Sequence, residues 1–249
     1  MTTELTARQT QILKVIIDEY LSTAEPVGSL ALERKYSLGI SPATIRNEMS
    51  ELIAKGYLRQ PHTSAGRIPT PQAMKFYINQ LMDEKQVSVS DEVQAKEKVW
   101  DVRLNRDDLM REATHALSLK TGSLAVATIE GEGVWSYGHS FLFTHPQLFD
   151  MQVCYNLFVA LEEQRRLEEL FLDRLTGMNP IEVLFGEELG RGYLDPIGIV
   201  ASRFNVGNKV GAIGIIGPFG LHYPSIIPTV RYFGSLLKEL TDEQTENAS

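Results

Sequence analysis

The chain has 249 residues, which is long enough for two domains of ordinary size. Its content of 43% hydrophobic and 22% charged residues is typical of a folded globular protein and excludes a disordered chain. It has no apolar run near the roughly 18 residues that a membrane helix needs, and no signal-peptide pattern. A single cysteine, Cys154, excludes an internal disulfide and a multi-cysteine metal site. These features predict a soluble, cytoplasmic protein with no membrane partner.

The net charge of −8 is unevenly distributed along the chain. Residues 1–83 hold nine basic and eight acidic side chains, whereas the remainder holds 15 basic and 24 acidic ones. Within residues 34–67 six basic side chains stand against two acidic ones. A basic segment on an acidic protein fits a small anion-binding module joined to a larger partner domain. On charge alone, chance clustering on a solvated surface is an equal alternative.

Residues 1–82 show four helical patterns and two short extended segments. Thr6 and Gln9 form a capping box at the start of the first helix. Ser41 and Pro42 begin the third helix, and Gly56 ends it. The predicted elements are helices at 5–21, 27–36 and 41–55, strands at 57–60 and 67–69 around a polar loop at 61–66, and a helix at 72–82.

The rest of the chain mixes strands with helices. Gly207 and Asn208 lie between two apolar segments and are typical of a hairpin turn. The predicted elements are helical segments at 93–119 with a break near 104–105, strands at 124–129 and 133–143, a helical segment at 146–172, strands at 181–185, 197–204 and 210–216, and a helix at 225–240. This order favours an α+β fold with an antiparallel sheet flanked by helices. The predicted domain boundaries are 1–83 and 93–240, with a linker at 84–92 and a polar tail at 241–249.

The third helix has two unlike faces. One face is apolar and is predicted to be buried; it holds Ile45, Met49, Leu52 and Ile53. The opposite face is small, polar and positively charged; it holds Ala43, Thr44, Arg46, Asn47, Ser50 and Ala54. Arginine pairs with guanine and asparagine with adenine in the major groove, and a helix N-terminus favours a phosphate. A merely solvated helix face usually carries more Glu and Lys, so this face predicts a DNA-reading helix.

The loop that follows is a candidate wing. Its hydroxyls can hold backbone phosphates, and Arg67 can do the same or enter the minor groove. An ordinary polar hairpin is the alternative, and the neighbouring basic helix disfavours it. Three helices followed by a strand, a loop and a returning strand are the order of a winged helix-turn-helix. The candidate DNA-binding residues are Ser41, Ala43, Thr44, Arg46, Asn47, Ser50, His62, Thr63, Ser64 and Arg67.

Enzyme and metal motifs are not found in the sequence. It contains no P-loop, GxSxG or HExxH pattern. His139 and His145 lie six residues apart, but no cysteine or carboxylate pattern joins them. The glycines of 207–220 lack the strand-then-helix context of a nucleotide site. We therefore assign no catalytic, cofactor-binding or metal-binding residue and expect no cofactor.

Three N-terminal segments read TAEPVGS at 23–29, SPATIRNEM at 41–49 and QPHTSAGRIPT at 60–70. These segments resemble the family of the heat-inducible transcription repressor HrcA. The GAIGIIGP segment at 211–218, with the helix from Ser225, is similar to the family's final strand and helix. The N-terminal similarity is specific and nearly continuous over the first domain. The C-terminal similarity is confined to shorter segments.

This resemblance implies a homodimeric repressor that binds an inverted repeat in double-stranded DNA upstream of chaperone operons. It also implies release on heat stress, a chaperonin that assists the active state, a GAF-like second domain, and a nucleoid-associated location when DNA is bound. Carried over by residue, DNA contacts fall on the third helix and on the loop at 62–67. This chain departs from the family between Ile129 and Val134, where other members carry an inserted dimerisation region.

Two other functions are weighed against repression of chaperone genes. The first is a winged-helix regulator that senses a small molecule in a GAF-like pocket lined by the strands of 181–216. The second is a winged helix that contacts protein instead of DNA. Such a surface should be apolar or acidic, which Arg46 and Asn47 oppose.

Overall fold

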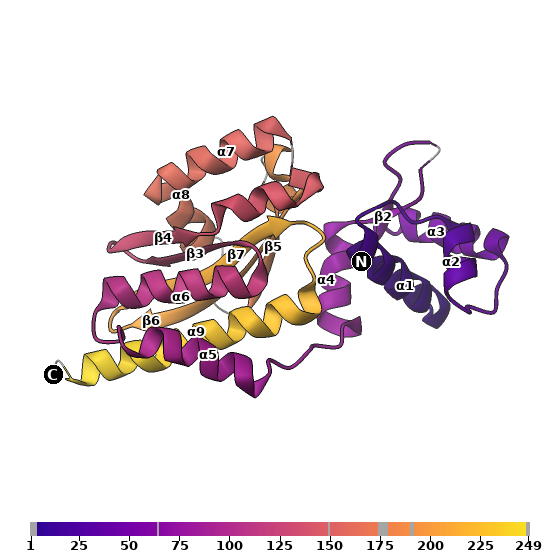
Figure 1. The fold of residues 1–249 in the computed structure, drawn as a ribbon. Helices are drawn as coiled ribbons and strands as arrows, with labels where there is room; N and C mark the ends of the chain where they lie inside the picture. Colours follow the sequence, from indigo (N-terminus) through magenta and orange to yellow (C-terminus); the bar gives the residue numbers. More distant parts are fainter. Residues whose placement is uncertain (1–3, 64, 149, 174–178, 190–191, 248–249) are drawn as a thin grey trace. The chain divides into compact units, whose positions relative to one another are not determined.

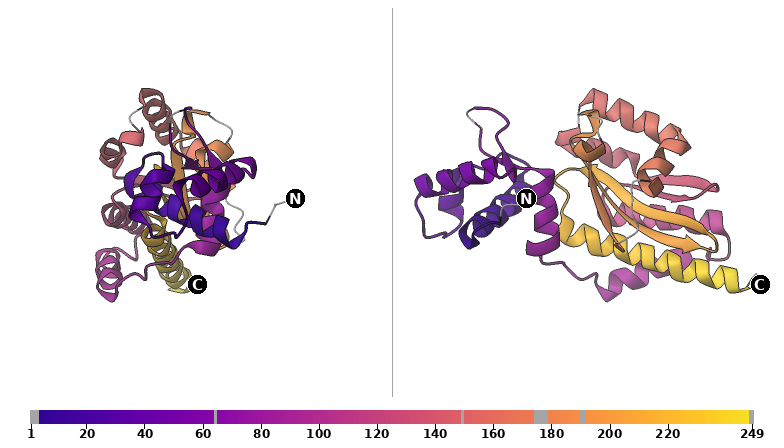
Figure 2. Two further views of the ribbon diagram at one scale, coloured as in Figure 1. Left: turned by 90° about the vertical axis from the view of Figure 1, so that its right-hand side faces the viewer. Right: turned by 180° about the vertical axis from the view of Figure 1, so that it is seen from behind.

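The computed structural model describes residues 4–63, 65–148, 150–173, 179–189 and 192–247 (Figure 1, Figure 2). The chain divides into two compact units, residues 1–83 and residues 84–249. The fold mixes helices with antiparallel sheet, as the α+β prediction states. Among the described residues, no helix has both the length and the apolar character needed to cross a bilayer.

Unit 1 consists of helices around a small hairpin. Its elements are α1 (Ala7–Thr23), α2 (Ser29–Lys35), α3 (Pro42–Ala54), β1 (Leu58–Arg59), β2 (Ile68–Pro69) and α4 (Pro71–Phe76), which continues as a π-helical turn at Tyr77–Leu81. The capping box of Thr6 and Gln9 is present, and the Ser41 and Thr70 side chains cap α3 and α4. The sequence therefore predicted the caps of α1 and α3 correctly.

The core of unit 1 forms where α1, α2 and α3 meet. Its fully buried apolar residues are Ile12, Leu13, Ile16, Ile17, Leu32, Ile45 and Leu52. Val27, predicted as helical, is instead extended and pairs with Arg67 as an antiparallel bridge. Each backbone N–H donates to the other residue's carbonyl at 2.8 Å. This pairing delays the start of α2 to Ser29.

Unit 2 is built on a five-stranded antiparallel sheet with strand order β4-β3-β7-β6-β5. Its strands are β3 (Leu124–Ile129), β4 (Gly133–Tyr137), β5 (Glu182–Phe185), β6 (Ile197–Val206) and β7 (Lys209–Pro218). Its helices are α5 (Val89–Trp100), α6 (Arg106–Thr121), α7 (Met151–Glu162), α8 (Gln164–Glu168) and α9 (Tyr223–Asn247). Short 3-10 turns occur at His139–Thr144, Pro146–Leu148, Gly186–Leu189 and Gly192–Leu194, and a π-helical turn occurs at Glu169–Asp173.

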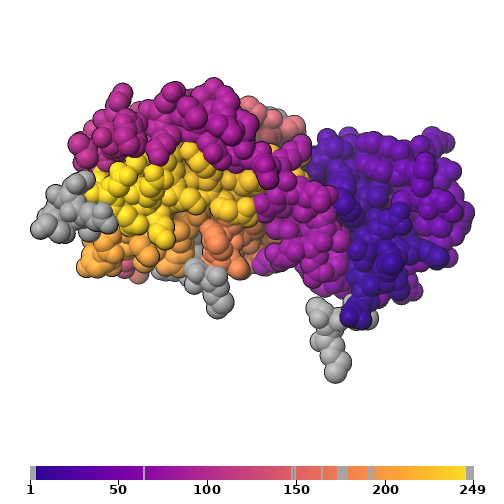
Figure 3. Space-filling model, turned by 90° about the horizontal axis from the view of Figure 1, so that it is seen from below, coloured from indigo at the N-terminus to yellow at the C-terminus, as the bar shows by residue number. Residues whose placement is uncertain are grey.

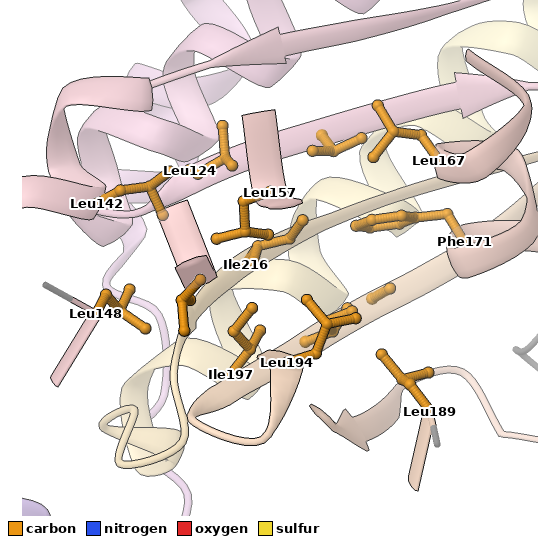
Figure 4. Packing of buried hydrophobic residues seen from close by; sticks show 14 of the residues in the cluster. Leu124, Leu142, Leu148, Leu157, Leu167, Phe171, Leu189, Leu194, Ile197 and Ile216 are labelled. Atoms are coloured by element: carbon orange, nitrogen blue, oxygen red, sulfur yellow. The ribbon is translucent and has the colours of Figure 1, made fainter. Parts of the chain in front are cut away.

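Helices cover both faces of this sheet (Figure 1). On one face α6 and α9 pack on the strands, and α5 packs against α6. Figure 3 shows α9, in yellow, running along the magenta segment that contains α5 and α6. On the other face Leu157, Leu167 and Phe171 pack with Leu124 and Ile216 of the sheet (Figure 4). The strands of 181–216 thus contribute apolar side chains to a packed core.

Two predicted elements of unit 2 are shorter in the structure. The strand predicted at 133–143 ends at Tyr137, because Gly138 takes a left-handed φ of 87° and a 3-10 turn follows. A Cβ at Gly138 would lie 1.9 Å from Oγ of Ser118, so the chain passes too close there for a side chain. The helix predicted at 146–172 starts at Met151, where Asp150 caps α7, and breaks at Glu163, whose backbone is extended.

The predicted linker and tail also differ from the structure. Helix α5 begins at Val89, inside the segment predicted as linker, because Oγ of Ser88 accepts a hydrogen bond from the N–H of Asp91. Helix α9 continues to Asn247, through most of the predicted polar tail at 241–249. Residues 248 and 249 of that predicted tail lie outside the described residues. Thr241 is fully buried and donates to the carbonyl of Leu237 at 2.8 Å. The same hydroxyl lies 3.2 Å from the carbonyl of Asn205 in β6, so this part of α9 is in contact with the sheet.

Candidate nucleic-acid interface

Helix α3 is fixed by a polar cap at one end and by apolar contacts along one side. Oγ of Ser41 accepts a hydrogen bond from the Thr44 N–H at 3.2 Å. Ile45, Met49 and Leu52 are buried, as the helical spacing predicted, whereas Ile53 is only half-buried. Because residues of the opposite face then point away from the core, this packing decides which side chains α3 presents outward.

The outward face of α3 is polar, small and basic. Ala43, Arg46, Asn47 and Ser50 are exposed, and Thr44 is half-buried. Within the described part of the chain, the Arg46 guanidinium and the Asn47 amide have no hydrogen-bond or ion-pair partner. Ser50 instead donates its hydroxyl to the Arg46 carbonyl at 3.0 Å. The donors of Arg46 and Asn47 are therefore available to an outside ligand.

Other basic side chains of unit 1 are held by partners. Lys35 Nζ lies 2.5 Å from a carboxylate oxygen of Glu19. Lys55 Nζ donates to Oε1 of Gln9 at 2.8 Å and to the Glu4 carbonyl at 3.0 Å. These contacts stabilise unit 1, whereas the Arg46 guanidinium makes no such contact among the described residues. Arg34 of α2 also has no partner there, so Arg46 is distinguished by its place on the outward face of α3.

Gln9 of α1 positions α3, a role that the sequence did not reveal. The residue is buried, with only 6% of its surface exposed. The Gln9 Nε2 donates to a Glu48 oxygen at 3.2 Å, while its Oε1 accepts from Lys55. Arg8 also approaches Glu48, at 3.5 Å. The acidic neighbour of Asn47 is thereby directed towards α1, and its charge is partly balanced there.

The β1–β2 loop, Gln60–Arg67, is organised by its own side chains. Gln60 Nε2 donates to the carbonyls of Thr63 at 2.8 Å and Ala65 at 3.1 Å. His62 and Thr63 are exposed, and Ser64 lies outside the described residues. Gln60 was not among the predicted site residues, since an isolated glutamine has no sequence signature for this role.

Arg67 lies at the base of this loop and is half-buried. Its guanidinium donates to the carbonyls of Ala65 at 3.1 Å and Gly66 at 3.4 Å. Its backbone pairs with Val27. Arg67 and Arg46 line one cleft of about 180 Å³, between the start of α2, α3 and the loop. Arg67 thus lies near α3. Its guanidinium, however, is hydrogen-bonded to carbonyl groups of the loop itself.

The Ser41 hydroxyl caps α3, so substitutions of Ser41 can separate its effect on stability from its predicted contact with DNA. Ser41→Ala should destabilise unit 1 by about 1 kcal/mol, because it removes the cap of α3. Ser41→Asp keeps a capping oxygen but adds a negative charge beside the proposed phosphate contacts. We expect urea unfolding to separate Ser41→Ala from the wild type, and DNA titration to show the greater loss for Ser41→Asp. Equal DNA affinity of Ser41→Asp and the wild type would remove Ser41 from the interface.

A carboxylate between α1 and α2 makes the stability of unit 1 depend on pH. The hydrogen bond from Lys35 lowers the pKa of Glu19 most, and the Tyr36 hydroxyl adds to it at 2.8 Å. Burial, and then the same hydrogen bond, raise the pKa of Tyr36 to about 12. Since the folded pKa of Glu19 is depressed, its contribution is present above the unfolded pKa and is lost as pH falls through the folded value.

Glu19→Gln should therefore lower the unfolding free energy at pH 7 by up to about 1 kcal/mol, and the difference from wild type should shrink below about pH 4. Urea unfolding at several pH values measures this. Glu33→Gln, at an exposed position of α2, is the matched control and should change little. A difference that persists unchanged into acid would show that Glu19 acts by packing instead of by charge.

The two histidines that stand six residues apart in sequence lie at opposite ends of the 3-10 turn His139–Thr144. His139 Nε2 shares a hydrogen bond with the Ser136 hydroxyl at 3.2 Å. His145 ends the 3-10 turn that contains Leu142. Among the described residues, no three or more His, Cys, Asp or Glu side chains gather closely enough to hold a metal ion.

Comparison with known proteins identifies the family. The profile described as HrcA protein C terminal domain matches residues 69–227. The heat-inducible transcription repressor HrcA of Carboxydothermus hydrogenoformans is 26% identical over 335 aligned positions, covering 94% of this chain and 97% of that protein. The repressor of the same name from Desulforamulus reducens is 50% identical over 119 residues, covering 45% of this chain and 34% of that protein.

The longer comparison also shows a difference in length. Its 335 aligned positions exceed the 249 residues of this chain, so the relative carries segments that this chain lacks. In this chain a short turn joins β3 directly to β4, with Ile129 paired to Gly133.

A solved structure described as a hypothetical protein shares the fold. Its TM-score is 0.70 at 18% identity, and the match covers 98% of this chain and 99% of that one. The fold likeness and the profile match, which spans more than half of the chain, agree with the resemblance seen in the sequence. The chain belongs to the HrcA family of heat-inducible transcription repressors.

Proposed function

We propose that this chain represses transcription by binding double-stranded DNA through unit 1, acting as a winged helix-turn-helix. In this proposal α3 lies in the major groove and the β1–β2 loop follows the backbone beside it. The observation that carries it is the outward face of α3, where Arg46 and Asn47 are exposed and unpaired within the described residues. These are the two side-chain types that pair bidentately with guanine and adenine.

The individual contacts of the proposal divide into two groups. On α3, Arg46 and Asn47 read bases, while Ala43 and Ser50 are small enough to allow close approach to the groove. Ser41 and Thr44 lie at the start of the helix, where backbone N–H groups favour a phosphate. In the loop, His62, Thr63 and Ser64 contact the backbone. Arg67 supports the loop, since its guanidinium already bonds the carbonyls of Ala65 and Gly66.

The proposed biological target follows from family membership. The chain binds an inverted repeat upstream of chaperone operons as a homodimer in the cytoplasm, and heat releases it. A chaperonin assists the active form, as the sequence resemblance implies. Unit 2, with its antiparallel sheet between helices, acts as the GAF-like dimerisation and regulatory domain. A two-fold dimer would present two copies of α3 to successive turns of one face of the DNA, which is why the target is a repeat.

A gel-shift titration tests this function. Duplexes from the chaperone promoters of the source organism are compared with duplexes in which the inverted repeat is scrambled. We expect tight binding to the intact repeat, competition only by intact repeats, and loss of the complex when the protein is heated. Equal affinity for both duplexes would contradict sequence-specific repression, and no binding to either would contradict the DNA-binding function.

A further inference from the structure

Strand β4 forms an unprotected edge of the sheet in unit 2. It is the terminal strand in the order β4-β3-β7-β6-β5. Its neighbour β3 is buried throughout, whereas every residue of β4 is partly or fully exposed. The β4 sequence, Gly-Val-Trp-Ser-Tyr, contains no charge and no proline. Edge strands are normally blunted by lysine, proline or a bulge, because their outward N–H and C=O groups attract another strand.

The side chains beside this edge are held against α6. Trp135 Nε1 donates to a carboxylate oxygen of Asp107 at 2.7 Å. The Tyr137 ring lies against the His115 ring, with centroids 3.9 Å apart. An open groove of about 560 Å³ runs along β4 and the facing side of α6. The aromatic side chains of β4 are therefore in contact with α6 within a single copy.

We propose that a second copy of this chain adds its own β4 to this edge, antiparallel, with the two-fold axis at Trp135. This deepens the proposed function, on which it rests, because an inverted repeat calls for a two-fold dimer. Backbone donors and acceptors of two identical antiparallel strands complement each other. In this register Gly133 faces Tyr137 of the second copy and Val134 faces Ser136, so no like charges meet across the strands.

The position of α6 agrees with such a dimer. Helix α6 packs over both β3 and β4. In a continuous sheet, with strands about 4.8 Å apart, the two copies of α6 would lie about two strand spacings apart. That is about 10 Å, within the separation of packed helices.

Charged side chains beside this edge are paired within one copy. Arg111 lies 2.8 Å from Asp107, and Arg106 lies 2.9 Å from Glu132, which directly precedes β4. A second copy of β4, which is itself uncharged, therefore meets this edge without breaking these ion pairs.

Two variants test the edge in the full-length protein without DNA. Tyr137→Lys places at the edge the residue that natural edge strands use to prevent pairing. Sedimentation equilibrium should show a dimer dissociation constant raised at least about tenfold, which corresponds to about 1.4 kcal/mol. Tyr155→Lys, at a 67% exposed tyrosine of α7, is the matched control and should stay within about twofold of the wild type.

Trp135→Cys gives a positive signal that loss of folding cannot imitate. Residues directly opposite across an antiparallel pair have Cβ atoms about 4.5–5.5 Å apart, so a short bis-maleimide should join the two copies rapidly. Tyr155→Cys should cross-link no faster than the wild type, whose Cys154 is buried.

The proposal is overturned by a monomeric wild-type chain, by equal effects of Tyr137→Lys and Tyr155→Lys, or by equal cross-linking of the two cysteine variants. None of these outcomes depends on DNA. A gel shift of the wild type on intact and scrambled repeats reports separately on the proposed function. If the wild-type dimer binds the operator and the β4 variants do not change its dimer dissociation constant, this interface is wrong and the proposed repressor function is unaffected.

Discussion

Arg46→Ala is expected to weaken binding to the intact operator by about 1–3 kcal/mol while leaving affinity for scrambled DNA almost unchanged. The Arg46 guanidinium is exposed on α3 and has no partner within the described residues, so its removal should not unfold unit 1. If it reads a guanine in each half-site, its loss affects only the specific complex. Fluorescence anisotropy titrations with both duplexes, at one stated salt concentration, measure the difference.

Lys238→Ala is the control for net charge in this comparison. Lys238 is an exposed basic residue of α9, far along the chain from the proposed interface. We expect its removal to change both affinities little. Should Arg46→Ala lose the same free energy on intact and scrambled DNA, Arg46 would be a phosphate contact and the base-reading role would be wrong.

Gly66→Ala is expected to open the contact that anchors the β1–β2 loop. A Cβ at Gly66 would lie 2.5 Å from the backbone carbon and oxygen of Val27 and 2.7 Å from the carbonyl carbon of Pro26. Backbone atoms cannot yield as a flexible side chain can, so the Val27–Arg67 pairing must separate. Overpacking of this kind costs about 1–3 kcal/mol.

Amide hydrogen exchange reports this change locally. The Val27 N–H and the Arg67 N–H should exchange faster by about tenfold for each 1.4 kcal/mol lost. Gly28→Ala is the matched control, since a Cβ there meets nothing within 4 Å. DNA affinity should fall for Gly66→Ala on both intact and scrambled duplexes, because the loop carries proposed phosphate contacts. Unchanged exchange at Val27 would contradict this view of the loop.

Local signals explain why the sequence predicted unit 1 well. The Thr6–Gln9 capping box and the Ser41-Pro42 start each involve residues three or fewer positions apart. The apolar stripe of α3 repeats with helical periodicity, so its buried face could be read without knowing its neighbours. Once the buried face of α3 is known, the residues on the opposite side of the helix are predicted to be exposed.

Contacts between distant residues explain what the sequence did not reveal. Gln9 bridges Glu48 and Lys55 only because α1 and α3 lie together. Thr241 looked like part of a polar tail, yet its hydroxyl bonds within α9 and approaches the carbonyl of Asn205. The strand predicted at 133–143 ends before Gly138, whose φ is left-handed, and Ser118, twenty residues earlier, leaves no room for a Cβ there. Periodicity within a single segment contains none of this information.

Dimethyl sulfate protection of operator DNA tests the central claim, that α3 reads the major groove, most directly. The reagent methylates N7 of guanine, an atom that lies in the major groove. The full-length wild type should protect guanines symmetrically in both half-sites of the inverted repeat, and Arg46→Ala should restore reactivity at one guanine in each. A bound complex whose major-groove guanines all stay reactive would contradict the account.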